Sequence, residues 1–420
     1  MTTQSKYSKE AVLSELDLFT IPPVQKSIER SYEVQYRPIS SLDSTKIIEF
    51  SIPTSKDEYI LLHETYFYVK IQLKIRKADD SALTIQDWET VTPVNNLLHS
   101  MIKQVELEIG GKEVTMSNST YAYRAYIENM LGFSADAKNS HLSSCLWMEN
   151  AIRRRSFFTP RSFADGSSKE VDLYGRLHFD MTFQGKAILG GKDIKDRVSD
   201  VAMVIKDACL YVHKMKATPQ LTNAHSKALA IAPACYPISR VDLRQASIHA
   251  NSLDAVLDNI ITGQLPRRLF LLMVKNTAFN GSKSQDPFHF DHFNVSHAAC
   301  YVDGVQFPTN AYQPDFKNQL CVREYSGLFQ AMNMNSTDTT VNITREDFMG
   351  GKTIFAFNFA PDLSHGPGMT GHINPIKRGS LRVQLRFSEP LRETITVLLY
   401  CEFDNIIEID LERNAVTDFK

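Results

Sequence analysis

The sequence has no long apolar segment and no closely paired cysteines. Its longest strongly apolar run, Leu269 to Val274, is far too short to span a bilayer, and the first residues, Met-Thr-Thr-Gln-Ser-Lys, have no apolar signal-peptide core. We therefore expect no membrane span, and synthesis in the host cytoplasm without secretion. The six cysteines show no C-x-x-C spacing, which argues against a zinc site or a redox motif and favours buried reduced thiols.

The sequence also has no excess of charge of one sign, since 46 basic residues face 48 acidic ones and the formal net charge is −2. A chain that grips nucleic acid through its phosphates needs a clear excess of Lys and Arg, so we expect no tight DNA binding. With 43% apolar and 22% charged residues, the composition is that of a globular protein. A chain of 420 residues exceeds the usual size of one hydrophobic core, which predicts two domains of roughly 200 residues each.

Apolar and polar residues alternate with a period of two in several segments, which is typical of half-buried strands. The clearest are Phe67 to Ile75, Val105 to Ile109 and Leu381 to Phe387. The second ends at Gly110-Gly111, a pair that readily adopts the positive φ angles of a tight hairpin. Helical patterns are few, around residues 123–131, 322–332 and 218–229, so the sequence predicts an all-β protein with a few short helices in its loops.

Four landmarks in the first half recur in the same order in the second half, at offsets of roughly 200 residues. They are Gly111 and Gly304 in turns, Tyr126 and Tyr325 in helical segments, Gly175 and Gly379 before alternating runs, and Tyr211 and Tyr400 in closing strands. This repeat predicts two tandem eight-stranded jelly rolls. The expected division is an N-terminal arm at 1–40, a first jelly roll at 41–217, a linker with a short helix at 218–235, a second jelly roll at 236–412 and a C-terminal tail at 413–420.

Several stretches resemble the double jelly-roll major capsid proteins of Polinton (Maverick) elements and adinto-like viruses. In the first half the resemblance is carried by Pro93-Val-Asn-Asn-Leu-Leu-His and the residues up to Lys112. In the second half it is carried by Leu265-Pro-Arg-Arg-Leu-Phe, Tyr301-Val-Asp-Gly and Glu402-Phe-Asp-Asn-Ile-Ile-Glu-Ile-Asp. The resemblance extends over about residues 30 to 418, and the family is related in fold to adenovirus hexons and virophage capsid proteins.

This resemblance implies a structural protein without catalytic, cofactor-binding or metal-binding residues. It implies homotrimeric, pseudo-hexameric capsomers of an icosahedral virion capsid that encloses DNA without binding it tightly, assembled in the cytoplasm or the nucleus. Such a capsomer cannot fill a fivefold vertex, so a single jelly-roll penton protein is the implied partner. The arm at 1–40 is a candidate tie between capsomers.

Two other functions remain open from the sequence. Jelly rolls also house non-haem iron(II) oxygenases, in which two histidines and one carboxylate bind the metal. His289 and Asp291 have the H-x-D spacing of that site, His372 is the candidate distal ligand, and Arg382 could hold a cosubstrate carboxylate. The second alternative is a carbohydrate-binding or receptor-binding jelly roll, for which the least periodic segments, 135–169, 276–291 and 362–378, are the candidates.

Two clusters of residues have both a structural and a nucleic-acid interpretation. The run Arg153-Arg154-Arg155 could contact nucleic acid, although a solvated loop or an interface is the simpler reading. Tyr121, Tyr123 and Tyr126 could stack on bases, although aromatic residues at helical spacing are more often packing groups.

Overall fold

The structure is a computed structural model of the chain. It describes all residues except 1–15, 17, 20, 22, 43–46, 54, 56, 78–82, 90, 116–118, 161–165, 179–199, 283, 364–371, 373, 413 and 418–420. No helix among the described residues is long and apolar enough to cross a membrane.

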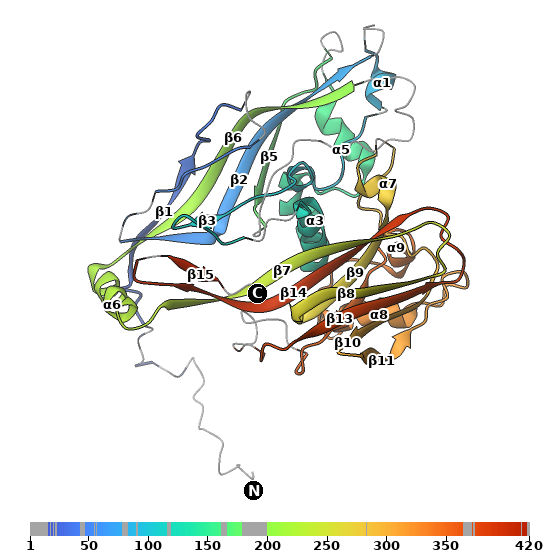
Figure 1. Ribbon diagram of the computed structural model, residues 1–420. Coiled ribbons are helices and arrows are strands. Elements are labelled where there is room, and N and C mark those ends of the chain that lie inside the picture. The colour runs from blue at the N-terminus through green and yellow to red at the C-terminus, as the bar shows by residue number, and fades with distance from the viewer. Residues whose placement is uncertain are drawn as a thin grey trace.

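The first half is built on one antiparallel sheet with the strand order β1-β6-β2-β5 (Figure 1). Its strands are β1 (Ile28–Tyr36), β6 (Asp200–Ala217), β2 (Glu58–Arg76) and β5 (Val171–Arg176). As the alternation predicts, one face of β2 is buried, at Phe67, Val69, Ile71, Leu73 and Ile75. Each such side chain stabilises the fold by about 1.5–3 kcal/mol when it leaves water.

Helices cover the buried face of this sheet. They are α1 (Ile85–Glu89), α2 (Leu97–Ser100), α3 (Tyr121–Gly132), α4 (Ala135–Asn139), the 3-10 helix η2 (His141–Cys145) and α5 (Ala151–Phe158). The contact is close at Gly175 of β5, where an added Cβ would lie 2.3 Å from Cys145 Sγ and 2.6 Å from Leu98 Cδ2. A short hairpin, β3 (Glu108–Ile109) and β4 (Lys112–Glu113), precedes α3.

The second half has two sheets that face each other. The first contains β12 (Phe355–Asn358), β9 (Arg268–Lys275), β14 (Ile395–Ile409), β7 (Ala234–Ile248) and β15 (Ala415–Thr417). The second has the order β11 (Val305–Tyr312), β10 (Val295–Val302), β13 (Arg378–Phe387) and β8 (Asp254–Gln264). The helices are α6 (Pro219–Leu229) in the linker, α7 (Asn276–Phe279), α8 (Val322–Ala331) and α9 (Arg345–Met349).

One sheet of each half has the same strand order, which agrees with the repeat read from the sequence. Among the described residues, the first half has no counterpart of the sheet β11-β10-β13-β8. The order β1-β6-β2-β5 is matched by β7-β14-β9-β12 in the second half. In each half a tight hairpin is followed by a helix, α3 or α8, and Gly111 and Gly304 occupy these hairpins with φ of 76° and 83°. Tyr211 and Tyr400 lie in the matching strands β6 and β14.

Other sequence expectations are corrected. Gly175 lies in the edge strand β5, whereas Gly379 lies in β13 between β10 and β8, so these two landmarks do not occupy matching strands. Residues 179–183 of that match lie outside the described residues. The strand expected at Val105 to Ile109 is reduced to the two residues of β3.

Two expected boundaries also differ from the structure. The arm expected at 1–40 contains β1, which pairs with β6, and the tail expected at 413–420 contains β15, which pairs with β14. Both strands lie at sheet edges; β1 has no fully buried residue and β15 is only three residues long, so they carry little hydrophobic signal in the sequence. The division into two jelly rolls with a linker otherwise remains our proposal.

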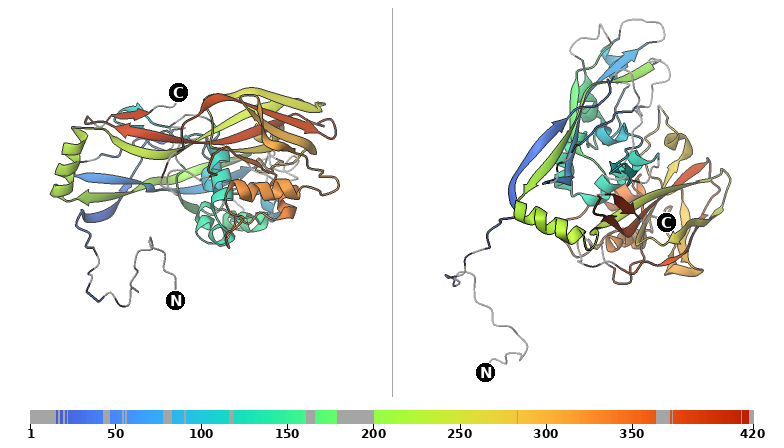
Figure 2. Two further views of the ribbon diagram at one scale, coloured as in Figure 1. Left: turned by 90° about the horizontal axis from the view of Figure 1, so that it is seen from below. Right: turned by 60° about the vertical axis from the view of Figure 1, so that its left-hand side comes forward.

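The halves pack against each other through the helices of the first half. Both figures place α3 between the sheet of the first half and the β7-β14-β9 side of the second half (Figures 1 and 2). This places aromatic and charged side chains of both halves in one junction.

Candidate functional site

The three residues of the iron-site hypothesis are described, and they do not form a metal centre. No group of three or more His, Cys, Asp or Glu side chains among the described residues is placed to hold a metal ion. His289 is exposed and its ring packs against the backbone of Gly351, where an added Cβ would lie 2.5 Å away. Asp291 Oδ1 accepts a hydrogen bond of 3.3 Å from the backbone N–H of Phe293.

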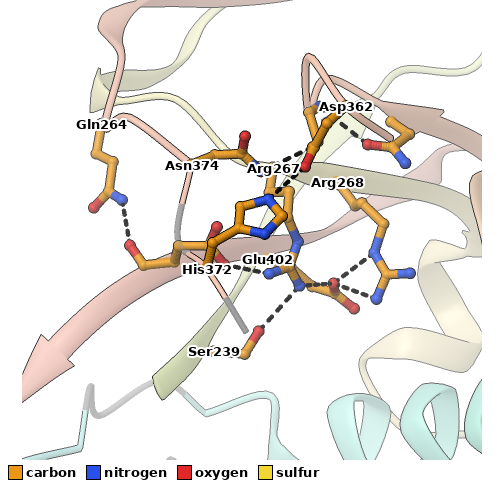
Figure 3. A network of polar contacts seen from close by, with 11 residues as sticks. Ser239, Gln264, Arg267, Arg268, Asp362, His372, Asn374 and Glu402 are labelled. Carbon is orange, nitrogen blue, oxygen red and sulfur yellow. Dashed lines mark hydrogen bonds and ion pairs between the residues drawn. The ribbon is translucent and has the colours of Figure 1, made fainter. Parts of the chain in front are cut away.

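His372 is engaged elsewhere, because its Nε2 lies 2.6 Å from Asp362 Oδ2 (Figure 3). Asn374 Nδ2 donates to the other oxygen of Asp362 at 3.0 Å. Arg382, the candidate for holding a cosubstrate, lies over the ring of Tyr301 at 4.4 Å from the ring centroid. The described residues therefore do not assemble an oxygenase site.

The close view shows a buried ionic network beside this loop (Figure 3). Glu402 Oε2 in β14 accepts hydrogen bonds from Arg267 Nη2 at 2.9 Å and Arg268 Nε at 2.7 Å. Arg267 also pairs with Asp404 and donates to Ser239 Oγ at 3.2 Å. All four charged side chains are at most 14% exposed.

Every charged group of the network is paired. Burying an unpaired charge costs several kcal/mol, and here each guanidinium has a carboxylate partner. In the sequence, these segments carry the family resemblance, but their meeting in one cluster is not apparent. The available signal was the spacing Glu402-Phe-Asp404 within an otherwise apolar strand, opposite Arg267-Arg268.

Aromatic rings hold the two halves together. Tyr126 of α3 stacks on Phe288 of the second half, with centroids 4.1 Å apart and planes at 2°, and Tyr123 stacks on Phe279 at 5.2 Å. Tyr121, Tyr123 and Tyr126 are all at most 7% exposed. They are packing groups, as the simpler reading predicted, and are not available to stack on bases.

A charged cluster centred on Glu128 of α3 lies in the same junction. Its Oε1 accepts from Arg124 Nε at 2.6 Å and from the hydroxyl of Tyr400 in the second half at 3.3 Å, and its Oε2 lies 2.5 Å from His178 Nδ1. Arg124 and His178 lower the pKa of Glu128 to about 2, against the opposing effect of burial. The carboxylate therefore stays charged and links α3 to β14 and to the segment that follows β5.

A buried histidine completes this cluster. His99 of α2 is 1% exposed, its Nδ1 lies 3.0 Å from the hydroxyl of Tyr121, and its ring meets that of His178 edge-on at 4.8 Å. Burial, and secondarily the nearby His178, lower the pKa of His99 well below its usual value. The site is chemically suited to holding the halves in register.

Two of the three segments expected to present ligand-binding loops belong to this junction. In 135–169, Lys138 donates to the carbonyls of Met130 and, across the junction, Val341, at 2.7 Å each. In 276–291, Phe279 and Phe288 carry the aromatic contacts described above. Residues 364–371 and 373 of the third segment lie outside the described residues.

The arginine run at 153–155 has a structural role in part. Arg154 is 7% exposed, and its guanidinium donates to the backbone carbonyls of Pro93 at 2.9 Å and Glu149 at 3.1 Å. Arg155 Nε donates to Thr92 Oγ1 at 3.2 Å. These contacts within the first half favour a structural role for the run over nucleic-acid binding.

Comparison with known proteins places this architecture among viral proteins. No protein-family model matches the sequence. An uncharacterized protein of Caenorhabditis elegans is 24% identical over 405 residues, which span 88% of this chain and 93% of the relative. A chain in the structure of the Sputnik virophage is 11% identical, with a TM-score of 0.67 over 98% of this chain and 93% of that chain.

The Faustovirus major capsid protein is 9% identical, with a TM-score of 0.59 over 94% of this chain and 93% of that chain. Both likenesses extend over nearly the full length of each chain, so they include both halves. They agree with the shared strand order of the two halves and confirm the fold implied by the resemblance. The chain has the double jelly-roll fold of viral major capsid proteins.

Proposed function

We propose that this protein is the major capsid protein of a virus or virus-like DNA element and forms homotrimeric, pseudo-hexameric capsomers of an icosahedral shell. The observation that carries the proposal is the full-length likeness to a capsid protein, together with a sheet of the same strand order in each half of the chain. Three chains of two similar barrels give six similar units around a threefold axis, and such a near-hexagonal tile packs a closed shell.

The finer parts of the proposal come from the sequence resemblance and the composition. The Polinton (Maverick) type of element is supported by the resemblance and by an animal relative of nearly the same length. A single jelly-roll penton protein is the proposed partner at fivefold vertices. With a formal net charge of −2, the shell would enclose DNA without tight binding. The proposed location is the virion capsid, with synthesis in the host cytoplasm and assembly there or in the nucleus.

An enzymatic role has no geometric support. His289, Asp291 and His372 each have other contacts and do not converge. We therefore propose a structural protein that needs no cofactor. Elemental analysis that found about one iron per chain, lost in a His289→Ala variant, would overturn this part.

Analytical ultracentrifugation with negative-stain microscopy tests the capsid proposal. The 47.6 kDa chain should sediment as a trimer at micromolar concentration, and images should show pseudo-hexagonal particles or shells. Contacts between trimers should be weaker than those within them, because a shell has to correct misplaced tiles before it closes. A salt series should therefore break shells into trimers before trimers into monomers. A dominant species of one chain mass would contradict the proposal.

A further inference from the structure

The outer face of the first-half sheet carries a cluster of four tyrosines. Tyr66 lies opposite Tyr211 in the ladder of β2 and β6, and Tyr68 lies opposite Tyr174 in the ladder of β2 and β5. Tyr66 and Tyr174 stack with centroids 5.0 Å apart, and Tyr211 meets Tyr174 edge-on at 5.8 Å. We call these four residues the tyrosine face.

The tyrosine face is partly exposed, and the sheet to which it belongs lies at the border of the molecule (Figure 1). The hydroxyls of Tyr68, Tyr174 and Tyr211 have no hydrogen-bond partner among the described residues, whereas that of Tyr66 donates to Glu64 at 3.1 Å. The opposite face of the same strand is the buried stripe that begins at Phe67. The sheet thus packs its own core on one side and presents aromatic rings on the other.

The matching face of the second half is covered within the chain. Tyr400, which corresponds to Tyr211, lies opposite Phe270, and Leu398 lies opposite Leu272 on the same face. All four are at most 4% exposed, and Tyr400 donates to Glu128 of α3 in the first half. Within each chain, the helical side of the first half therefore covers this face of the second half.

We propose that the tyrosine face binds the second half of another copy of this chain, on the side that carries α8. This inference rests on the proposed trimer. If two similar halves alternate around a ring of three chains, the contact between α3 and the Tyr400 face repeats between chains as a contact between α8 and the Tyr211 face. Such a contact joins two different surfaces, as a closed threefold ring requires.

The two surfaces have the chemistry of a protein interface. Aromatic residues are enriched at the centre of such interfaces and charged residues at the rim. Charged side chains surround the tyrosine face. Lys70 forms an ion pair with Glu170 at 3.7 Å, and Arg176 forms one with Glu64 at 3.4 Å.

On the side of α8, Leu320 and Val322 are 64% and 52% exposed. These two large apolar side chains are exposed close together in the sequence, and a second copy of the chain would cover them. A sheet face is also flatter than the concave sites in which small ligands are usually held, which favours a protein partner over a sugar.

Substitution gives the first test. The Tyr211→Glu variant should lose the trimer at concentrations where wild type keeps it, with at least about a tenfold rise in the concentration needed for assembly, because truncating a central aromatic anchor commonly costs more than 1 kcal/mol and here adds a buried charge. Ile152→Glu is the matched control, since Ile152 is a 70% exposed apolar residue of the first half on α5. The control should assemble like wild type.

Photo-crosslinking gives the second test, which does not depend on the folding of a charged variant. A benzophenone amino acid replaces Tyr174, and the protein is assembled from a mixture of normal and nitrogen-15-labelled chains. Crosslinks should join one copy to residues 313–332 of another, as mixed-isotope peptides. If the wild type is a trimer but the Tyr211→Glu variant also assembles normally, or if the crosslinks fall on other residues, this interface is wrong and the capsid proposal stands. A monomeric wild type overturns both.

Discussion

Glu128 is the residue at the junction whose replacement should be most informative. Its side chain is 23% exposed, and its carboxylate contacts Arg124, His178 and the hydroxyl of Tyr400. A pKa shift from 4.5 to about 2 corresponds to about 3 kcal/mol, at about 1.36 kcal/mol per pKa unit. A glutamine keeps an acceptor but not the charge. We therefore expect Glu128→Gln to cost about 2 kcal/mol, or about 2–4 °C in melting temperature for a chain of this size.

The pH dependence of the folded protein's stability provides a second test of this prediction. Because the pKa of Glu128 is lower in the folded protein than the usual 4.5, its stabilisation is complete above that pH and is lost as the pH falls toward about 2. The difference in melting temperature between wild type and Glu128→Gln should stay constant above pH 4.5 and shrink below it.

Tryptophan fluorescence during heating is the suitable assay, at one fixed protein concentration. The chain has two tryptophans, and Trp147 packs against Tyr126 at the junction, with centroids 4.8 Å apart and ring planes tilted by 32°. Glu389→Gln is the matched control because Glu389 pairs with Lys317 on the surface, and it should change the melting temperature by less than about 1 °C. Equal shifts in both variants, or a difference that persists unchanged at acid pH, would refute the reasoning.

Four further substitutions test local assignments. Gly304→Val and Gly111→Val should each cost more than about 1 kcal/mol, because a β-branched residue is strained at φ of 83° or 76°; unchanged melting temperatures in both would contradict the turns. Glu402→Gln should cost about 3 kcal/mol, because two buried guanidinium groups lose their shared carboxylate, and a melting temperature equal to that of wild type would show that the network is dispensable. Because burial lowers the pKa of His99 below the usual 6.5, the stability of the folded protein should fall as the pH drops below that value. The His99→Phe variant should flatten the pH dependence of the melting temperature between about pH 7 and pH 5. An unaltered slope in thermal melts would contradict this role of His99.

The sequence alone was sufficient where the signal is local or periodic. The alternation from Phe67 to Ile75 identified the buried face of β2 because successive strand residues point to opposite sides of a sheet. Gly111 and Gly304 marked hairpins because few other residues adopt positive φ readily. The helices α3, α6 and α8 were found from their spacing and start signals. The order of such features also revealed the repeat, and with it the fold.

The sequence was insufficient where a residue's role depends on a distant partner. β1 was assigned to an arm because a half-exposed edge strand has little apolar alternation, and only its pairing with β6 makes it part of the sheet. Gly175 and Gly379 looked equivalent because runs that alternate with a period of two resemble one another in any strand. The H-x-D spacing of His289 and Asp291 likewise says nothing about where His372 lies, and in the structure His372 contacts Asp362.

Only the tertiary structure decided which polar and aromatic groups are buried together. Glu128 and Tyr400 are far apart in the sequence, and they meet because α3 lies between the sheets of the two halves. The same packing buries Tyr400 and leaves Tyr211 partly exposed, although the two residues occupy matching positions in the repeat. Sequence periodicity fixes which side of a strand faces its own core, whereas the arrangement of the two halves decides which outer faces are covered within one chain and which are left for another.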